Sequence, residues 1–136
     1  MRMLNGVVRF AATIAVVVMF AGTARADHQT VKVATNEKLG SYLTDAKGMT
    51  LYVFKKDSPG KSACAGDCVT KWPLYYQEEV GVTGSLQAAD FATVTREDGK
   101  KQTTYKGLPL YYFSGDKAAS DTKGQGFKDL WTVAAP

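Results

Sequence analysis

The chain has 136 residues, of which 45% are hydrophobic and 22% are charged, and its formal net charge is +4 at pH 7. This balance is typical of a folded globular protein, and it excludes an intrinsically disordered chain, which would combine few hydrophobic residues with a high net charge. Two cysteines are too few for a disulfide-dense scaffold.

The N-terminal segment, from Met1 to Ala26, is predicted to be a secretory signal peptide. Basic residues flank an apolar run from Ile14 to Phe20, and Ala24 and Ala26 give the small-x-small pattern that signal peptidase cleaves. The run is short for an uncleaved membrane anchor, which is the alternative. Cleavage after Ala26 would remove three of the 17 basic residues and leave 14 against 13 acidic ones. We therefore expect no nucleic-acid-binding or anionic-membrane surface, and no stable membrane span, in the mature chain.

Residues 27–136 are predicted to fold as a single mainly β domain. Thr30 to Ala34 alternates polar and apolar residues, as a half-buried strand does. A short strand from Ser41 to Thr44 follows, then a turn that ends at Gly48, and then the strand Thr50 to Lys55. Strand geometry places Tyr52 and Phe54 on one face of this last strand.

A short helix is predicted next, with Ser62 as its N-cap and Pro73 at its end. Residues 77–84 lack periodicity and are expected to form a loop. Residues 85–91 are expected to form one helical turn.

A β-hairpin is predicted around the Asp98-Gly99 turn, with strands from Phe91 to Arg96 and from Lys101 to Tyr105. Leu110 to Phe113 and Leu130 to Val133 complete the expected strands, and residues 115–126 are expected to be an exposed loop.

The chain contains an internal repeat, in which the stretch that ends at Trp72 recurs in the stretch that ends at Trp131. In an ungapped alignment of the two, eight positions between Thr44 and Trp72 are identical to their counterparts, where chance would supply about two. The matched positions are Thr44/Thr103, Lys47/Lys106, Gly48/Gly107, Leu51/Leu110, Tyr52/Tyr111, Phe54/Phe113, Asp57/Asp116 and Trp72/Trp131. The fold is therefore predicted to consist of two pseudo-equivalent antiparallel half-repeats, approximately residues 40–73 and 99–133, with one or two short helices.

The repeated pattern Tyr-x-aromatic-x-x-Asp occurs as Tyr52, Phe54, Asp57 and as Tyr111, Phe113, Asp116. These residues resemble the motif of a bacterial family of predicted lipoproteins, described as secreted repeats of unknown function, and the resemblance runs from about Gly40 to Val133. The resemblance implies an exported protein and leaves its activity open. Many members carry a lipid on a cysteine, and this chain has no such lipobox cysteine near Ala26.

The motif residues allow two interpretations. The favoured one makes the tyrosines and phenylalanines core residues and has Asp57 and Asp116 cap the following turns. The alternative is that Tyr52, Asp57, Tyr111 and Asp116 converge on a ligand, such as a cation or a planar cofactor; haem held by a tyrosine is one such case.

Cys64 and Cys68 have no counterparts in the second repeat. A disulfide is the expected state in an oxidising exported compartment. The alternative is a reduced pair that carries copper or another soft metal, or exchanges disulfides. Only His28 and Met49 would remain as further soft-metal ligands in the mature chain.

No catalytic motif is present: the sequence has no G-x-S-x-G, Walker or G-x-G-x-x-G pattern. We therefore expect a non-catalytic binding or interaction module, periplasmic or secreted, with no cofactor and with an envelope protein as a candidate partner. A thiol-based metal or redox carrier is the second hypothesis.

Overall fold

The computed structural model describes residues 15–16 and 30–136. The predicted signal peptide lies outside the described residues apart from positions 15–16, as do its cleavage site after Ala26 and the single histidine, His28. Within the described residues, no helix is long and apolar enough to cross a membrane.

The fold is mainly β, as predicted. The strands are β1 (Thr30–Asn36), β2 (Gly40–Thr44), β3 (Tyr52–Phe54), β4 (Gly81–Val82), β5 (Phe91–Thr95), β6 (Lys101–Tyr105), β7 (Leu108–Pro109) and β8 (Trp131–Val133). One short α-helix, α1 (Asp67–Lys71), and two 3-10 turns, η1 (Ala88–Asp90) and η2 (Phe127–Asp129), complete the part of the chain that the structure describes.

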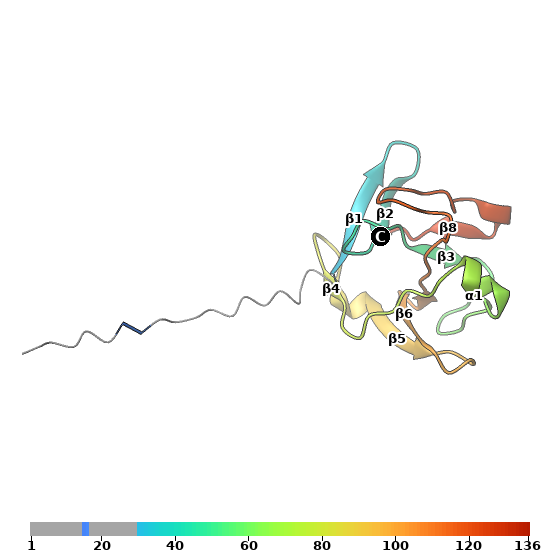
Figure 1. The fold of residues 1–136 in the computed structure, drawn as a ribbon, viewed down its shortest axis with the longest axis horizontal. Helices are drawn as coiled ribbons and strands as arrows, with labels where there is room; N and C mark the ends of the chain where they lie inside the picture. Colours follow the sequence, from blue (N-terminus) through green and yellow to red (C-terminus); the bar gives the residue numbers. More distant parts are fainter. Residues whose placement is uncertain (1–14, 17–29) are drawn as a thin grey trace, which may run out of the picture.

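An antiparallel hairpin leads into each repeat, β1–β2 into the first and β5–β6 into the second, and the two hairpins lie on opposite sides of β3 (Figure 1). Val33 pairs with Leu43 in the first hairpin, and Thr93 pairs with Thr103 in the second. The two hairpins have the same strand register, with Thr93 in the place of Val33 and Thr103 in the place of Leu43. The Asp98-Gly99 turn closes the second hairpin as expected, with Gly99 at a φ of 81° that favours glycine.

The central strands of the two repeats exchange partners. Tyr52 of β3 pairs with Val133 of β8, and Tyr111 forms a bridge with Leu74. These two pairs are equivalent, because the alignment that places Tyr52 on Tyr111 also places Leu74 on Val133. Tyr52 and Tyr111 also pair with each other, through reciprocal N–H···O bonds of 2.8 and 3.0 Å. When a residue pairs reciprocally with its own counterpart, a local twofold axis passes between the two residues. The repeats are therefore related by a pseudo-twofold rotation about an axis between Tyr52 and Tyr111.

The hairpins and the central strands correspond in slightly different alignments because the second repeat has a connection one residue shorter. Thr44 bridges to Thr50, whereas Thr104 pairs with Pro109. Thr44 therefore corresponds in space to Thr104, and its match to Thr103 in the ungapped sequence comparison is one residue out of register.

Local structure departs from the sequence prediction in three places. The helix begins at Asp67 after Gly66, with no side-chain cap, and the Ser62 hydroxyl, four residues before Gly66, lies against the Tyr111 hydroxyl. The predicted loop at 77–84 contains β4, which pairs in parallel with β1 through Val31 and Val82. The expected strand from Leu110 to Phe113 is reduced to bridges at Tyr111. Backbone pairing with distant segments decides the second and the third, and such pairing leaves little local pattern.

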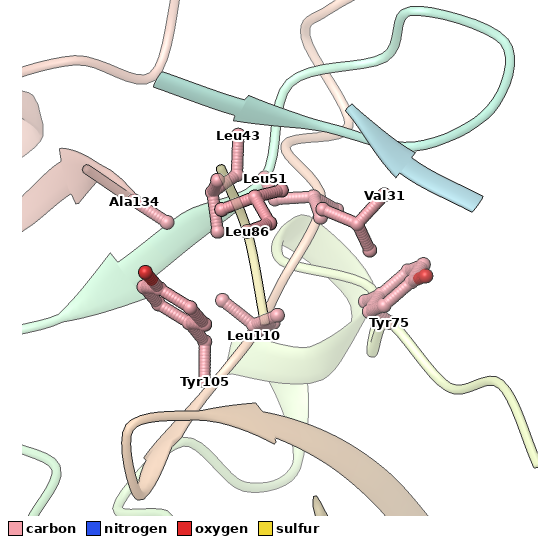
Figure 2. Packing of buried hydrophobic residues seen from close by; sticks show 8 residues of the cluster. All are labelled: Val31, Leu43, Leu51, Tyr75, Leu86, Tyr105, Leu110 and Ala134. Atoms are coloured by element: carbon pink, nitrogen blue, oxygen red, sulfur yellow. The ribbon is translucent and has the colours of Figure 1, made fainter. Parts of the chain in front are cut away.

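One hydrophobic cluster lies between the hairpins and the central strands (Figure 2). Its buried members are Val31, Leu43, Leu51, Tyr75, Leu86, Tyr105, Leu110 and Ala134. The pseudo-symmetry holds here too, because Tyr75 N–H donates to the Leu110 carbonyl (3.0 Å) and Ala134 N–H donates to the Leu51 carbonyl (2.8 Å). This cluster fixes the central strands that carry the aromatic residues described next.

Candidate functional site

A second cluster, made almost entirely of aromatic residues, lies at the interface of the two repeats. The indole rings of Trp72 and Trp131 stack with 3.7 Å between centroids and 3° between planes. Phe54 lies against Trp131 at 4.3 Å, and its counterpart Phe113 lies against Trp72 at 4.5 Å. The result is a column of four rings, which we call the aromatic column, in which each phenylalanine contacts the tryptophan of the other repeat.

The repeated tyrosines and aspartates pair across the two repeats. The Tyr52 hydroxyl donates to Asp116 Oδ2 at 2.7 Å, and the Tyr111 hydroxyl donates to Asp57 Oδ2 at 2.6 Å. Each tyrosine ring also meets the edge of the tryptophan of its own repeat, at 5.4 Å for Tyr52 on Trp72 and 5.0 Å for Tyr111 on Trp131. Both exchanged pairs therefore fasten one repeat to the other beside the aromatic column.

The electrostatics of these pairs follow from burial. Tyr52 and Tyr111 are fully buried, and loss of solvent, reinforced by the bonded aspartates, raises the pKa of both hydroxyls. Burial is also the largest influence on Asp57 and Asp116, and it raises the pKa of each carboxyl above its ordinary value. Both tyrosines therefore remain protonated donors throughout the physiological pH range.

The other oxygen of each aspartate caps a turn. Asp57 Oδ1 accepts from Ala63 N–H at 2.6 Å, and Asp116 Oδ1 accepts from Lys123 N–H at 2.9 Å. Both oxygens of each carboxyl thus have protein partners. This arrangement supports the structural interpretation of the motif over a ligand held directly by Tyr52, Asp57, Tyr111 and Asp116.

A buried polar network accompanies only one of the two pairs. Arg96 Nη1 donates to Ser62 Oγ at 2.7 Å and to Gln102 Oε1 at 2.8 Å, and Nη2 donates to the Cys64 carbonyl. The Ser62 hydroxyl in turn lies against the Tyr111 hydroxyl. In the other pair, the Tyr52 hydroxyl accepts a hydrogen bond from the Gly124 N–H at 3.1 Å. Sequence reasoning missed Arg96, since an arginine beside a hairpin turn ordinarily faces solvent.

Cys64 and Cys68 form the expected disulfide, with a Cα separation of 5.3 Å. Cys64 is buried, while Cys68 is half-buried at the start of α1. The cystine thus braces α1 against the aromatic cluster. Both sulfurs are engaged in this structure, and residues 30–136 hold no group of three metal-ligating side chains.

A surface cleft of about 290 Å³ opens over the aromatic column between α1 and η2. Its floor is made by Phe54, Trp72 and Trp131. The half-buried side chains of Cys68, Phe127 and Leu130 form its walls.

Three charged side chains stand at the rim of the cleft: Asp67, Lys71 and Lys128. The Lys71 ammonium lies 4.0 Å from the centroid of the Phe127 ring, and that of Lys128 lies 5.8 Å from the same centroid. Both distances fall within the range of cation–π attraction. The cleft therefore combines an aromatic floor with a rim of net positive charge.

Of the residues expected to carry function, the cleft brings together Phe54 and Cys68. Tyr52, Tyr111, Phe113 and the two aspartates support its floor and do not line it. The floor of the cleft had a signal in the sequence, because Trp72 and Trp131 are identical residues at equivalent positions of the two repeats. Lys71, Phe127 and Lys128 have no repeated pattern, and nothing in the sequence alone marks them.

Comparison with known proteins yields one match. A family model described as a secreted repeat of unknown function matches residues 33–75 and 92–135. No curated protein and no solved structure matches the chain. The two matched segments cover most of both structural repeats and more than half of the chain, so this protein belongs to the family of secreted repeats of unknown function.

Proposed function

We propose that this protein is an exported binding module, periplasmic or secreted, that holds a small planar molecule in the cleft over the aromatic column and does no catalysis. The observation that carries the proposal is the floor of the cleft, where Phe54, Trp72 and Trp131 meet. Small-molecule sites are typically concave, largely apolar and placed where two units of a fold meet, and this cleft has all three properties.

The size of the cleft favours a small ligand. Its volume of about 290 Å³ lies just below the range of ordinary ligand sites, which run from about 300 to 1,000 Å³. Aromatic rings prefer stacked or edge-to-face neighbours, so a flat ring is the shape that this floor and the Phe127 wall complement best.

The floor is rigid before any ligand arrives. Trp72 and Trp131 are only 2% and 3% exposed, and each is fixed by its stacked partner, by a phenylalanine of the other repeat and by a tyrosine edge. The exchanged Tyr–Asp pairs hold those tyrosines in turn. A preformed surface costs little conformational entropy on binding. In this account the family motif serves the cleft by building its floor.

The proposal is tested by following tryptophan emission during titration. The chain has two tryptophans, Trp72 and Trp131, and both line the cleft, so any ligand there changes the emission directly. We expect saturable changes with 2-naphthoate or 2-naphthamide, confirmed by one-site calorimetry.

Phe127→Ala and Phe91→Ala make a matched pair for this test. Both phenylalanines are half-buried, but Phe127 forms a wall of the cleft while Phe91 packs against Tyr105 in the other cluster. Phe127→Ala is expected to weaken binding roughly fivefold, and Phe91→Ala to leave it unchanged. Equal effects of the two substitutions, or no saturable change with either compound, would contradict the proposal.

A further inference from the structure

We infer that the cleft selects planar aromatic anions, with the ring on the tryptophan floor and the negative group between Lys71 and Lys128. This inference rests on the proposed function and adds the chemical class of the ligand. Two features of the cleft support it: unpaired lysines and a strained backbone.

Lys71 has an obvious intrahelical partner that it does not use. Asp67 lies one helical turn earlier on α1, at the spacing where opposite charges attract along a helix. The ammonium of Lys71 instead lies over Phe127. Among residues 30–136 the ion pairs are Arg96–Asp98 and Lys123–Asp121, so both rim lysines keep an uncompensated charge.

The two ammonium groups converge on one ring. The Lys71 nitrogen lies 4.0 Å and the Lys128 nitrogen 5.8 Å from the centroid of the Phe127 ring. One lysine comes from each repeat. Two uncompensated ammonium groups at one rim give it a positive potential, which attracts a carboxylate or sulfonate. With Asp67 counted, the rim carries one net positive charge, which matches a monoanion.

The backbone that presents Lys128 is strained. Lys128 and Asp129 have φ values of 51° and 58°, in the left-handed region that side chains other than glycine rarely adopt. At the equivalent place in the first repeat, α1 continues as a helix. Strain of this kind concentrates at ligand sites, where the surrounding structure holds it in place.

The experiment compares three probes on the exported protein: 2-naphthoate, its neutral isostere 2-naphthamide, and cyclohexanecarboxylate, which has the charge without the aromatic ring. Calorimetry at low and moderate salt gives each dissociation constant. We expect 2-naphthoate to bind roughly tenfold more tightly than either other probe. Its advantage over neutral 2-naphthamide should shrink as salt rises, whereas its advantage over the equally charged cyclohexanecarboxylate should not.

Charge-removing variants locate the anion. Lys71→Met and Lys128→Met are each expected to weaken 2-naphthoate roughly fivefold and to weaken 2-naphthamide much less, because methionine keeps an apolar stem at the rim. Lys101→Met, which removes an exposed lysine from β6, is the matched control and should affect neither.

The outcomes separate this inference from the proposed function. Equal affinity for 2-naphthoate and 2-naphthamide, or insensitivity of 2-naphthoate to both rim substitutions, would overturn the anion preference and leave the cleft as a binding site. Equal affinity for cyclohexanecarboxylate and 2-naphthoate would overturn the aromatic preference. Failure of all three probes to bind would overturn both proposals.

Discussion

Trp72 and Trp131 come from opposite repeats and stack face to face, 3.7 Å between ring centroids and 3° from parallel. Because the two residues are counterparts in the repeats, the stack is the contact of one copy with the other across the pseudo-twofold axis. It supports the cleft on one side and contacts the buried tyrosines at its edges.

Removing either ring should therefore destabilise the protein to a similar degree. Trp72→Ala and Trp131→Ala are each expected to lower the free energy of unfolding by about 3–5 kcal/mol, the range for large-to-small changes in a core. Urea unfolding followed by circular dichroism measures both. A large loss for one variant and a negligible loss for the other would show that the two repeats do not share the column.

The buried tyrosines predict a loss of stability at alkaline pH. Burial raises the pKa of Tyr52, Tyr75, Tyr111 and Tyr112 in the folded protein, whereas in the unfolded chain tyrosine titrates near pH 10. Above about pH 10 the folded state thus holds more protons than the unfolded state, so stability falls as pH rises, by up to about 1.4 kcal/mol per pH unit for each such tyrosine.

Absorbance at 295 nm checks this directly, because it reports tyrosinate. These four side chains should ionise only together with unfolding. If these tyrosines titrated smoothly near pH 10 while the near-ultraviolet circular dichroism of the folded protein was unchanged, the prediction would be wrong.

The cystine is expected to make a modest contribution. Closing so small a ring stabilises by about 2 kcal/mol in the chain-entropy model. The double substitution Cys64→Ser, Cys68→Ser should lower the free energy of unfolding by about that amount while the protein still folds, since the second repeat forms its counterpart without cysteines. Urea titration of the oxidised wild type and the variant measures the difference, and an unfolded variant would refute the expectation.

Arg96 should matter more than its place beside a turn suggests. Arg96→Met would remove the guanidinium from Ser62, Gln102 and the Cys64 carbonyl. Ser62 and the Cys64 carbonyl keep other partners, whereas Gln102 Oε1 loses its donor, so we expect a loss of about 1–3 kcal/mol. Arg96→Lys should not restore stability, because an ammonium cannot reproduce the guanidinium fork.

Asp98→Asn is the control for Arg96. Asp98 is exposed and contacts Arg96 through its Nε at 3.1 Å. Loss of such an exposed pair is expected to cost less than about 1 kcal/mol. Thermal or urea unfolding of the three variants would contradict this ranking if Asp98→Asn were the most damaging.

Much of the fold is visible in the sequence because repetition and strand periodicity are local signals. The shared tyrosines, phenylalanines and tryptophans identified the interface of the repeats, and the Asp98-Gly99 turn identified the second hairpin. The partner of each aspartate was not visible. Asp57 follows Tyr52 in the same motif yet accepts from Tyr111, because the two segments run antiparallel beside each other at the axis and bring each carboxyl to the opposite copy.

The cleft was less visible for a related reason. Its rim and walls come from the segments where the repeats differ: α1 with its cystine in the first copy, and η2 with its left-handed residues in the second. Where the two repeats differ, comparing one with the other reveals nothing about a residue's role. Lys71 and Lys128 are recognised only in the structure, where both lie near the Phe127 ring.

The exchange of tyrosine–aspartate pairs between repeats is the central claim, and a pair of double-mutant cycles tests it most directly. The cycle of Tyr52→Phe with Asp116→Asn should give a coupling energy of about 1 kcal/mol or more, because these residues share a buried hydrogen bond. The cycle of Tyr52→Phe with Asp57→Asn, from the same motif, should be additive within about 0.5 kcal/mol. Strong coupling within the motif and additivity across the repeats would contradict the account.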